Sequence, residues 1–231
     1  SSDLSWGGNM VAEFYRCIDL AEADPQVRVI VITGAGRAFC AGADLKGRAS
    51  VIKGPGDLPA HSRRTRECFH AIRECTKPVI VAINGPALGA GLAIAASADI
   101  IITSDKGSLA LPEIDVGLLG GGSHAGRLFP HSTLRQMMFT GVRIGAEELY
   151  RLGVVTQVTT PEELRPAAIA LATTIASKSP LSIRLAKQTL NAIEDMSLRD
   201  GYRYEQDMTA AIAKTEDAKE AQRAFIEKRA P

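Results

Sequence analysis

The chain has 231 residues, of which 45% are hydrophobic, and this is enough to bury a core of its own. With 27 basic and 26 acidic residues its formal net charge is +1, which gives no electrostatic argument for a nucleic-acid or membrane partner. No apolar run approaches the roughly 18 residues that span a bilayer, and the N-terminus lacks the basic and apolar regions of a signal peptide. We therefore expect a soluble, cytoplasmic protein.

The cysteines lack the paired spacing of a zinc site and lie in apolar or helical surroundings. They are Cys17, Cys40, Cys68 and Cys75. Disulfides are rare in reducing compartments, so we expect free thiols and no metal site.

Three apolar, β-branched runs in the first half of the chain predict buried strands. They cover residues 27–33, 77–84 and 98–103. Helical segments near residues 62–75 and 89–97 separate these runs. This alternation favours right-handed β-α-β crossovers and a mostly parallel sheet. Residues 154–158 predict one further strand late in the chain.

The pattern becomes wholly helical from Pro161 onward. Apolar residues recur at helical spacing over residues 162–177, 180–196, 198–214 and 216–228. We therefore divide the chain into an α/β core, residues 1–160, and a helical C-terminal region, residues 161–231.

Two segments rich in small residues follow apolar runs. They are Cys40-Ala41-Gly42-Ala43-Asp44-Leu45-Lys46 and Asn84-Gly85-Pro86-Ala87-Leu88-Gly89-Ala90-Gly91. Small residues leave backbone N–H groups accessible to a ligand, and two amides that converge on one oxygen form an oxyanion hole. A third segment, Leu111-Pro112-Glu113-Ile114, places one carboxylate at an apolar turn. Burial there would raise the pKa of Glu113 and favour its use as an acid or a base.

In order and spacing, these three segments resemble the crotonase family, the enoyl-CoA hydratases and isomerases. Phe139-Thr140-Gly141 and Leu152-Gly153-Val154-Val155 extend the resemblance, which runs from about Val27 to the C-terminal Phe225-Ile226-Glu227-Lys228-Arg229. It implies an α/β, crotonase-like spiral fold of stacked β-α-β units with a helical C-terminal trimerisation region. The family's C-terminal helices pack against neighbouring subunits, which implies a homotrimer or a dimer of trimers.

The resemblance also implies an enzyme of fatty acid metabolism that acts on an acyl-CoA thioester. Coenzyme A would enter as part of the substrate, and no separate cofactor is expected. By position, the amides of Ala43 and Ala90 would form the oxyanion hole, and Glu113 would move a proton at the α-carbon. The resemblance places further residues along the bound thioester: Ala41, Asp44, Leu45, Lys46, Phe225 and Lys228. Of these, Lys46 and Lys228 match lysines that meet the coenzyme, and Phe225 matches an aromatic residue of the acyl pocket.

One departure from the family bears directly on the chemistry. Hydratases of the family use two glutamates, and the position of the first holds Ala93, within Gly91-Leu92-Ala93-Ile94. Without a carboxylate there to activate water, the sequence favours double-bond isomerisation or an unusual hydration. A single base at Glu113 suits isomerisation, because it can take a proton from one carbon and return it to another.

His124 stands in Gly120-Gly121-Gly122-Ser123-His124, where the family usually has only small residues. Its imidazole could replace the missing carboxylate as a base, or prime water for hydrolysis. Alternatively, His124 caps the helix that begins there. The leading alternative function is therefore hydrolysis of a thioester or of a C–C bond. A catalytically silent binding member of the family is a third interpretation, against which the retained Glu113 argues.

Overall fold

The computed structural model describes residues 9–44 and 53–229. A four-stranded parallel sheet lies at its centre, with the strand order β1-β2-β4-β7. Its strands are β1 (Ile30–Thr33), β2 (Val79–Ile83), β4 (Ile100–Ser104) and β7 (Val158–Thr159). The sequence predicted the first three, and their valines and isoleucines suit a pleated, buried surface.

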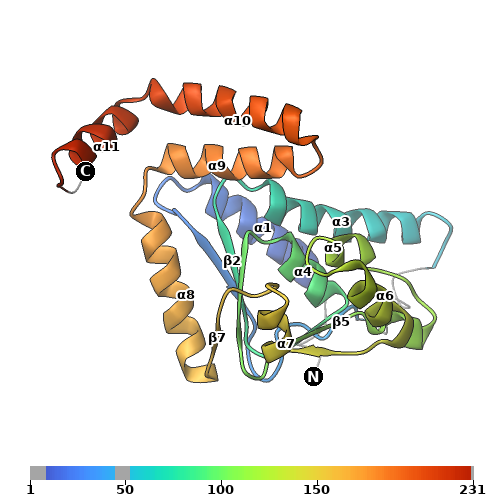
Figure 1. The fold of residues 1–231 in the computed structure, drawn as a ribbon. Helices are drawn as coiled ribbons and strands as arrows, with labels where there is room; N and C mark the ends of the chain where they lie inside the picture. The colour runs from blue at the N-terminus through green and yellow to red at the C-terminus, as the bar shows by residue number, and fades with distance from the viewer. Residues whose placement is uncertain (1–8, 45–52, 230–231) are drawn as a thin grey trace.

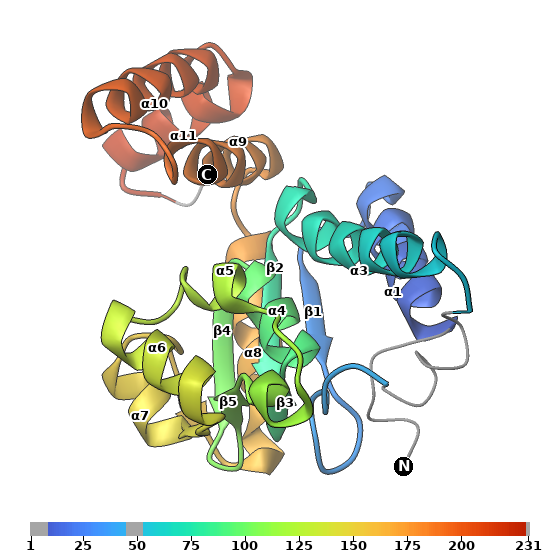
Figure 2. The same cartoon turned by 90° about the vertical axis from the view of Figure 1, so that its right-hand side faces the viewer.

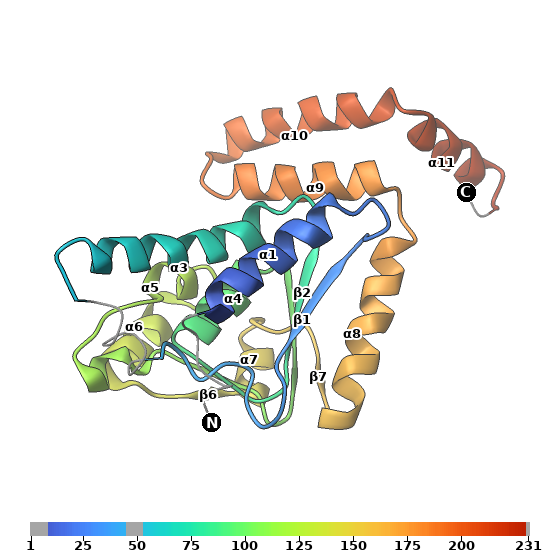
Figure 3. The same cartoon turned by 180° about the vertical axis from the view of Figure 1, so that it is seen from behind.

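Helices cover both faces of this sheet. Helices α1 (Asn9–Ala23) and α3 (Asp57–Glu74) pack together on one side, and α8 (Pro161–Ala176) packs against the strands from the other (Figure 3). Every residue of β2 is buried, because side chains on alternate positions face opposite helix layers. Val79, Val81 and Ile83 belong to the main core cluster, whereas Ala82 belongs to a second cluster with Leu164 and Ala168 of α8.

A second, three-stranded sheet has the order β3-β5-β6. It contains β3 (Pro86–Leu88), β5 (Ser108–Ala110) and β6 (Ile144–Gly145). Strands β3 and β5 are parallel, and β6 is antiparallel to β5. Cys40 adds an isolated parallel bridge to Ala87 of β3, which brings the segment after β1 to the edge of this small sheet.

Several short helices follow these strands. They are α4 (Ala90–Ser97), the 3₁₀ helix η2 (Pro112–Val116), α5 (Gly122–Ala125), α6 (His131–Thr140) and α7 (Ala146–Arg151). Helix α4 carries no charged residue and is buried from Gly91 to Ser97, so it forms the centre of the core between α3, α5 and the small sheet. Figure 2 shows α4, α5 and α6 on the same side of the central sheet.

The last three helices extend away from the sheet. They are α9 (Pro180–Ile193), α10 (Leu198–Ala213) and α11 (Glu216–Ile226). Each begins at a hydroxyl residue whose side chain accepts a backbone N–H of the first turn: Ser179, Ser197 and Thr215. Helix α9 crosses the end of the sheet beside α3, α10 packs back along α9, and α11 packs on α10 (Figure 1).

A buried lysine attaches α9 to the rest of the protein. Lys187 is only 6% exposed, and its ammonium group lies 2.9 Å from the Asp99 carboxylate. It also donates to the carbonyls of Ile72 and Lys77, at 3.1 and 3.0 Å. Because these acceptors lie at the end of α3 and the starts of β2 and β4, one side chain fixes α9 against three elements.

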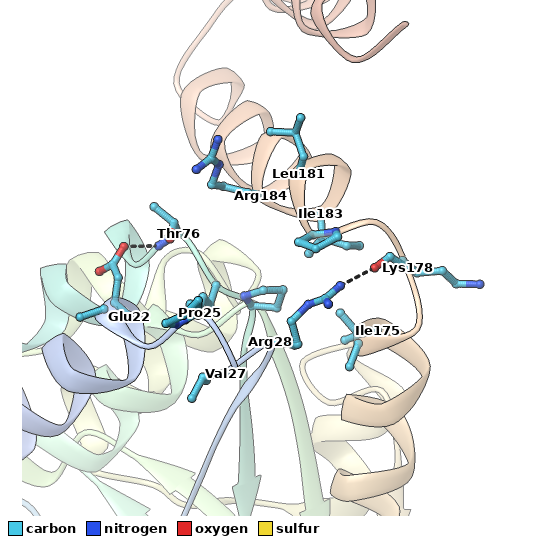
Figure 4. Close-up of a pocket in the computed structure, with 15 residues that line it drawn as sticks. Glu22, Pro25, Val27, Arg28, Thr76, Ile175, Lys178, Leu181, Ile183 and Arg184 are labelled. Atoms are coloured by element: carbon cyan, nitrogen blue, oxygen red, sulfur yellow. Dashed lines mark hydrogen bonds between the residues drawn. The ribbon is translucent and has the colours of Figure 1, made fainter. Parts of the chain in front are cut away.

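Beside this attachment, a pocket of about 450 Å³ separates the α8–α9 junction from the starts of β1 and β2. Figure 4 shows its polar contacts: Arg28 donates to the carbonyl of Lys178 at 2.8 Å, and the amide of Thr76 donates to Glu22 at 2.9 Å. The first contact joins the segment before β1 to the α8–α9 junction, and the second joins the end of α1 to the segment before β2. None of the residues that line the pocket belongs to the three segments singled out by the sequence.

The predicted element boundaries need three corrections. The late strand was predicted over residues 154–158, but β7 begins at Val158, because Val154 and Val155 are buried in the core after α7 instead of pairing. Helix α3 begins at Asp57, earlier than predicted, where the Asp57 carboxylate accepts the amides of Lys53 and Gly54. The strands of the small sheet were missed.

All four cysteines are free thiols. Across residues 9–44 and 53–229, no helix combines the length and apolar character needed to cross a membrane.

Candidate active site

The candidate site forms where two parallel strands end. Strands β3 and β5 run side by side, so their carboxyl ends lie at the same edge of the small sheet. Gly89 follows β3, and the segment of Leu111 to Glu113 follows β5. The amide of Gly89 donates to the carbonyl of Ala110 at 3.0 Å, which continues the pairing and brings Gly89 beside Glu113.

Only glycine fits at position 89. Its φ is +52°, a conformation that side chains rarely adopt, and a Cβ there would collide with Oε1 of Glu113. A Cβ built on Gly120 would lie 3.7 Å from the same oxygen, an ordinary contact distance. Two glycine backbones therefore lie beside Oε1 of Glu113, and at Gly89 a side chain would not fit.

The second oxygen of Glu113, Oε2, is buried and has no hydrogen bond within the part of the chain that the structure describes. Burial raises the pKa of Glu113, and the hydrogen bond from its own backbone amide only partly offsets this effect. An unpartnered buried oxygen costs free energy, so it marks a position prepared for a ligand or a proton.

The small-residue segment after β1 packs against the β3–α4 junction. The amide of Leu88 donates to the carbonyl of Cys40 at 2.9 Å, and a Cβ on Gly91 would lie 2.6 Å from that carbonyl. Gly42 has a φ of +97°, and its own Cβ would come within 3.1 Å of the Leu88 carbonyl. The structure therefore brings together the two segments that the sequence predicted to act as a pair.

The two predicted oxyanion amides lie in these segments. Ala90 is the first residue of α4, and the amides of a first helical turn have no partner within the helix. Its φ is not positive, since Lys228 is the only non-glycine residue with a positive φ in residues 9–44 and 53–229. Ala43 is exposed beside the buried Gly42. That these two amides act together on one oxygen stays a prediction.

The remaining members of the first segment differ in what the structure shows. Ala41 is exposed and Asp44 is half-buried. Leu45 and Lys46, predicted to meet the coenzyme, lie outside the described residues.

Ala93 lies three residues along α4 from Ala90, on the same side of the helix. It is 2% exposed, its amide donates to the carbonyl of Gly89, and its own carbonyl accepts the hydroxyl of Ser97. The methyl group is part of the main core cluster. At this position the site is therefore closed by an apolar side chain.

His124 belongs to α5 and packs edge-on against Phe69 of α3, with ring centroids 5.1 Å apart. Burial lowers the pKa of His124, and the charges of His70, Arg127 and Arg73 lower it further. The residue at the N-cap of α5 is Gly121, and no side chain among the described residues caps this helix, so the alternative in which His124 caps it was wrong. A role as a base stays a prediction.

Two other predicted residues lie apart from Glu113 in the same chain. Phe225 is 84% exposed in α11, and Lys228 is exposed just beyond that helix. Figures 1 and 3 show α11 at the far end of the C-terminal helices from α4 and α6. Within one chain, these residues do not join the site.

Sequence reasoning missed the residue that holds the first loop in place. Asn84, directly after β2, accepts the amide of Gly34 at 3.0 Å and donates to the carbonyls of Gly36 and Ala38, at 3.0 and 3.2 Å. One side-chain amide thus fixes the loop that leads into the Cys40 segment. The available signal was a polar residue directly after an apolar strand, at the carboxyl edge of a parallel sheet.

Known proteins are similar to this chain in sequence and in fold. The family model for enoyl-CoA hydratase/isomerase matches residues 6–231. A carnitinyl-CoA dehydratase from Salmonella arizonae is 39% identical over 217 residues, which cover 90% of this chain and 82% of that protein. A probable mitochondrial enoyl-CoA hydratase from Dictyostelium discoideum is 35% identical over 226 residues, covering 96% of this chain and 80% of the relative.

The crystal structure of an enoyl-CoA hydratase from Bacillus anthracis aligns with a TM-score of 0.93 and 31% identity, covering 100% of this chain and 90% of that chain. The chain therefore belongs to the enoyl-CoA hydratase/isomerase family and has the crotonase fold. It is a crotonase-family enzyme, as the sequence predicted.

Proposed function

We propose that this enzyme acts on an acyl-CoA thioester through an enolate, with Glu113 as the group that moves the proton. The observation that carries the proposal is the buried Oε2 of Glu113, which has no hydrogen-bond partner among the described residues. A carboxylate oxygen left unpaired at the edge where two amide-bearing segments meet is suited to accept a proton from a bound substrate.

In the proposed reaction, the thioester oxygen accepts hydrogen bonds from the amides of Ala43 and Ala90. A preorganised donor of this kind contributes about 2.7–4 kcal/mol to the transition state in comparable sites. Glu113 removes a proton from the substrate, the electron pair passes to the thioester oxygen as an enolate, and the protonated carboxyl returns the proton to carbon. The raised pKa of Glu113 suits both proton transfers, because the carboxyl group must accept a proton and then give it back.

Ala93 decides which reaction we favour. Its buried methyl group offers no second carboxylate to activate water, so we propose double-bond isomerisation, or a hydration that uses another base, over two-carboxylate hydration. Relatives named as an enoyl-CoA hydratase and as a carnitinyl-CoA dehydratase support an acyl-CoA substrate.

Hydrolysis is the second candidate. A Rhodococcus jostii protein named as an indene-carboxyl-CoA hydrolase is 35% identical over 189 residues, which cover 82% of this chain and 73% of that protein. The lowered pKa of His124 keeps its imidazole neutral near pH 7, the form in which it could take a proton from water.

We further propose that the active assembly is a homotrimer or a dimer of trimers, located in the cytoplasm and active in fatty acid metabolism. Phe225 lies in α11 and Lys228 directly after it, away from α4 in their own chain (Figure 1), and a neighbouring copy would bring them to the acyl group and the coenzyme. The other proposed contacts of coenzyme A, which enters as part of the substrate, are Ala41, Asp44, Leu45 and Lys46.

A panel of enoyl-CoA esters of different chain length, with products identified by mass, tests the proposal. We expect a product of unchanged mass but shifted double bond; a gain of one water across the double bond would favour hydration, and release of free coenzyme A would favour hydrolysis. Absence of any reaction or binding across the panel would overturn the proposed function.

Restoring the second carboxylate sharpens the distinction. In Ala93→Glu, hydration of crotonyl-CoA should rise, by as much as 10²–10⁴-fold for a well-placed base. Ala93→Gln is the matched control, because it has nearly the same volume but cannot accept a proton at neutral pH. Circular dichroism must show both variants folded, since either buries a polar group in the core. Equal rates in both variants would contradict the account of Ala93.

A further inference from the structure

One carboxylate of the C-terminal helices is held by two arginines of the α/β region. Glu194 caps the C-terminus of α9. Its Oε1 accepts Nε of Arg127 at 2.6 Å, and its Oε2 accepts Arg127 at 3.2 Å and Arg73 at 2.9 Å. The three side chains are between 27% and 31% exposed, so these contacts are partly screened from solvent. We name this three-residue arrangement the Glu194 clasp.

Arg127 connects the clasp to the two short helices that frame the candidate site. Its guanidinium also donates to the carbonyl of Ala96, in the last turn of α4, and its backbone amide donates to the carbonyl of His124 in α5. Helices α4 and α5 pack together. Arg127 therefore fixes the ends of both helices that lie away from Glu113.

The other ends of the same helices form the walls of the site. Helix α4 begins at Ala90, whose amide is a proposed oxyanion donor, and α5 begins one residue after Gly121. Gly120 and Gly89 flank the Glu113 carboxylate. Since α4 has only eight residues, about 12 Å of rigid helix separates the clasp from the site. Because so short a helix moves as one unit, a displacement of Ala96 also displaces Ala90.

The geometry points to Glu194 as a positioning residue, which acts through Arg127 to hold the starts of α4 and α5 against Glu113. The expected effect of Glu194 on catalysis rests on the proposed function, whereas its effect on the positions of α4 and α5 does not. Arg73 makes a comparison possible. It binds the same carboxylate, but it belongs to α3. Its other hydrogen bonds are with Asn191 of α9 and do not involve Arg127.

The charge of Glu194 supports this role. Although burial opposes its ionisation, the hydrogen bond from Arg127 and the charges of Arg127 and Arg73 outweigh that effect and lower the pKa of Glu194. The carboxylate is therefore ionised at neutral pH, and it can bind both guanidinium groups at once. Charge-assisted hydrogen bonds of this kind are about twice as strong as neutral ones.

The test compares three variants of the full chain: Glu194→Gln, Arg127→Met and Arg73→Met. Hydrogen–deuterium exchange is followed by mass spectrometry in peptides that cover residues 89–97 and 119–126. We expect exchange in both peptides to become about tenfold faster in Glu194→Gln and Arg127→Met, because a charged hydrogen bond that holds them is lost. A further variant that combines Glu194→Gln with Arg127→Met should show no further increase. Arg73→Met should leave both peptides at the wild-type rate.

Turnover provides the second readout. For a substrate found in the panel above, kcat should fall in Glu194→Gln while KM stays unchanged, and Arg73→Met should keep the wild-type kcat even if its unfolding temperature drops. Unchanged exchange in Glu194→Gln, or equal effects in Arg73→Met, would overturn the inference. If the wild-type enzyme turns over no acyl-CoA at all, the proposed function fails, and the exchange data alone still decide whether the clasp holds the two helices.

Discussion

Helices α4 and α11 differ in how far their apolar side chains are buried. Helix α4 is buried along almost its whole length and needs no partner outside the chain. Helix α11 buries Ala224, yet leaves Phe225 and Ile226 at 84% and 79% exposure. Burial within one chain therefore builds the site around α4, whereas α11 leaves apolar side chains exposed, and these are the side chains that the proposed assembly would cover.

The two regions also differ in how they are attached. The sheet and α8 meet through apolar side chains, whereas α9 meets the core through Lys187 and Glu194. Polar attachments fix an orientation, because hydrogen bonds are directional and apolar contacts are not.

The largest effect on stability is expected at Lys187. In Lys187→Met, Asp99 loses its buried ionic partner and two backbone carbonyls lose a donor, so the free energy of unfolding should fall by about 3–5 kcal/mol. Urea denaturation measures the change. Lys219→Met is the control, since its ion pair with Glu216 is exposed on α11 and should contribute less than about 1 kcal/mol. Similar losses in both variants would contradict the idea that α9 depends on a buried attachment.

A pair of leucines tests the contrast in burial. Leu92→Ala in α4 removes a side chain that is fully buried and should cost about 2–5 kcal/mol by the same measurement. Leu198→Ala in α10 removes one that is 92% exposed, and it should cost less than about 0.5 kcal/mol in the isolated chain. A large, concentration-dependent loss in Leu198→Ala would show that Leu198 is covered in an assembly.

The smallest expected effect is a pH dependence at His124. Burial and nearby positive charge lower its pKa from the ordinary value of 6.5, so the unfolded chain binds this proton more readily than the folded one. Stability should therefore fall as the pH drops below about 6.5 and be restored above it. Urea midpoints at pH 5.5 and 7.5 measure the change. His124→Phe keeps an aromatic ring beside Phe69 but cannot titrate, so its acid-side loss should be smaller than that of the wild type.

The long, strongly patterned elements could be predicted from the sequence. The valine and isoleucine runs of β1, β2 and β4 carry a clear strand signal, and the hydroxyl residues before α9, α10 and α11 mark helix starts. The small sheet could not be predicted, because β3 has only three residues, Pro86 to Leu88, and no alternation of polar and apolar positions. Its pairing depends on partners more than twenty residues away in the chain.

The same limit applies to the site. The glycines and Glu113 stood out in the sequence by type and order, and their expected convergence agrees with the observed packing of Cys40, Gly89 and Glu113. No local sequence pattern indicated which residues hold these segments in place. Asn84 and Glu194 act through hydrogen bonds to residues 46 or more positions away along the chain, so only the folded structure shows what they hold.

The most direct test of the central claim is deuterium exchange at the α-carbon of a saturated acyl-CoA in D₂O, followed by mass spectrometry. The wild-type enzyme should exchange this proton, and the rate should rise with pH through a midpoint above the ordinary glutamate value of 4.5, because the working base is a carboxylate with a raised pKa. Glu113→Gln should bind the same thioester but exchange about 10²–10⁴-fold more slowly. Exchange by Glu113→Gln at the wild-type rate would remove Glu113 from the mechanism and contradict the account.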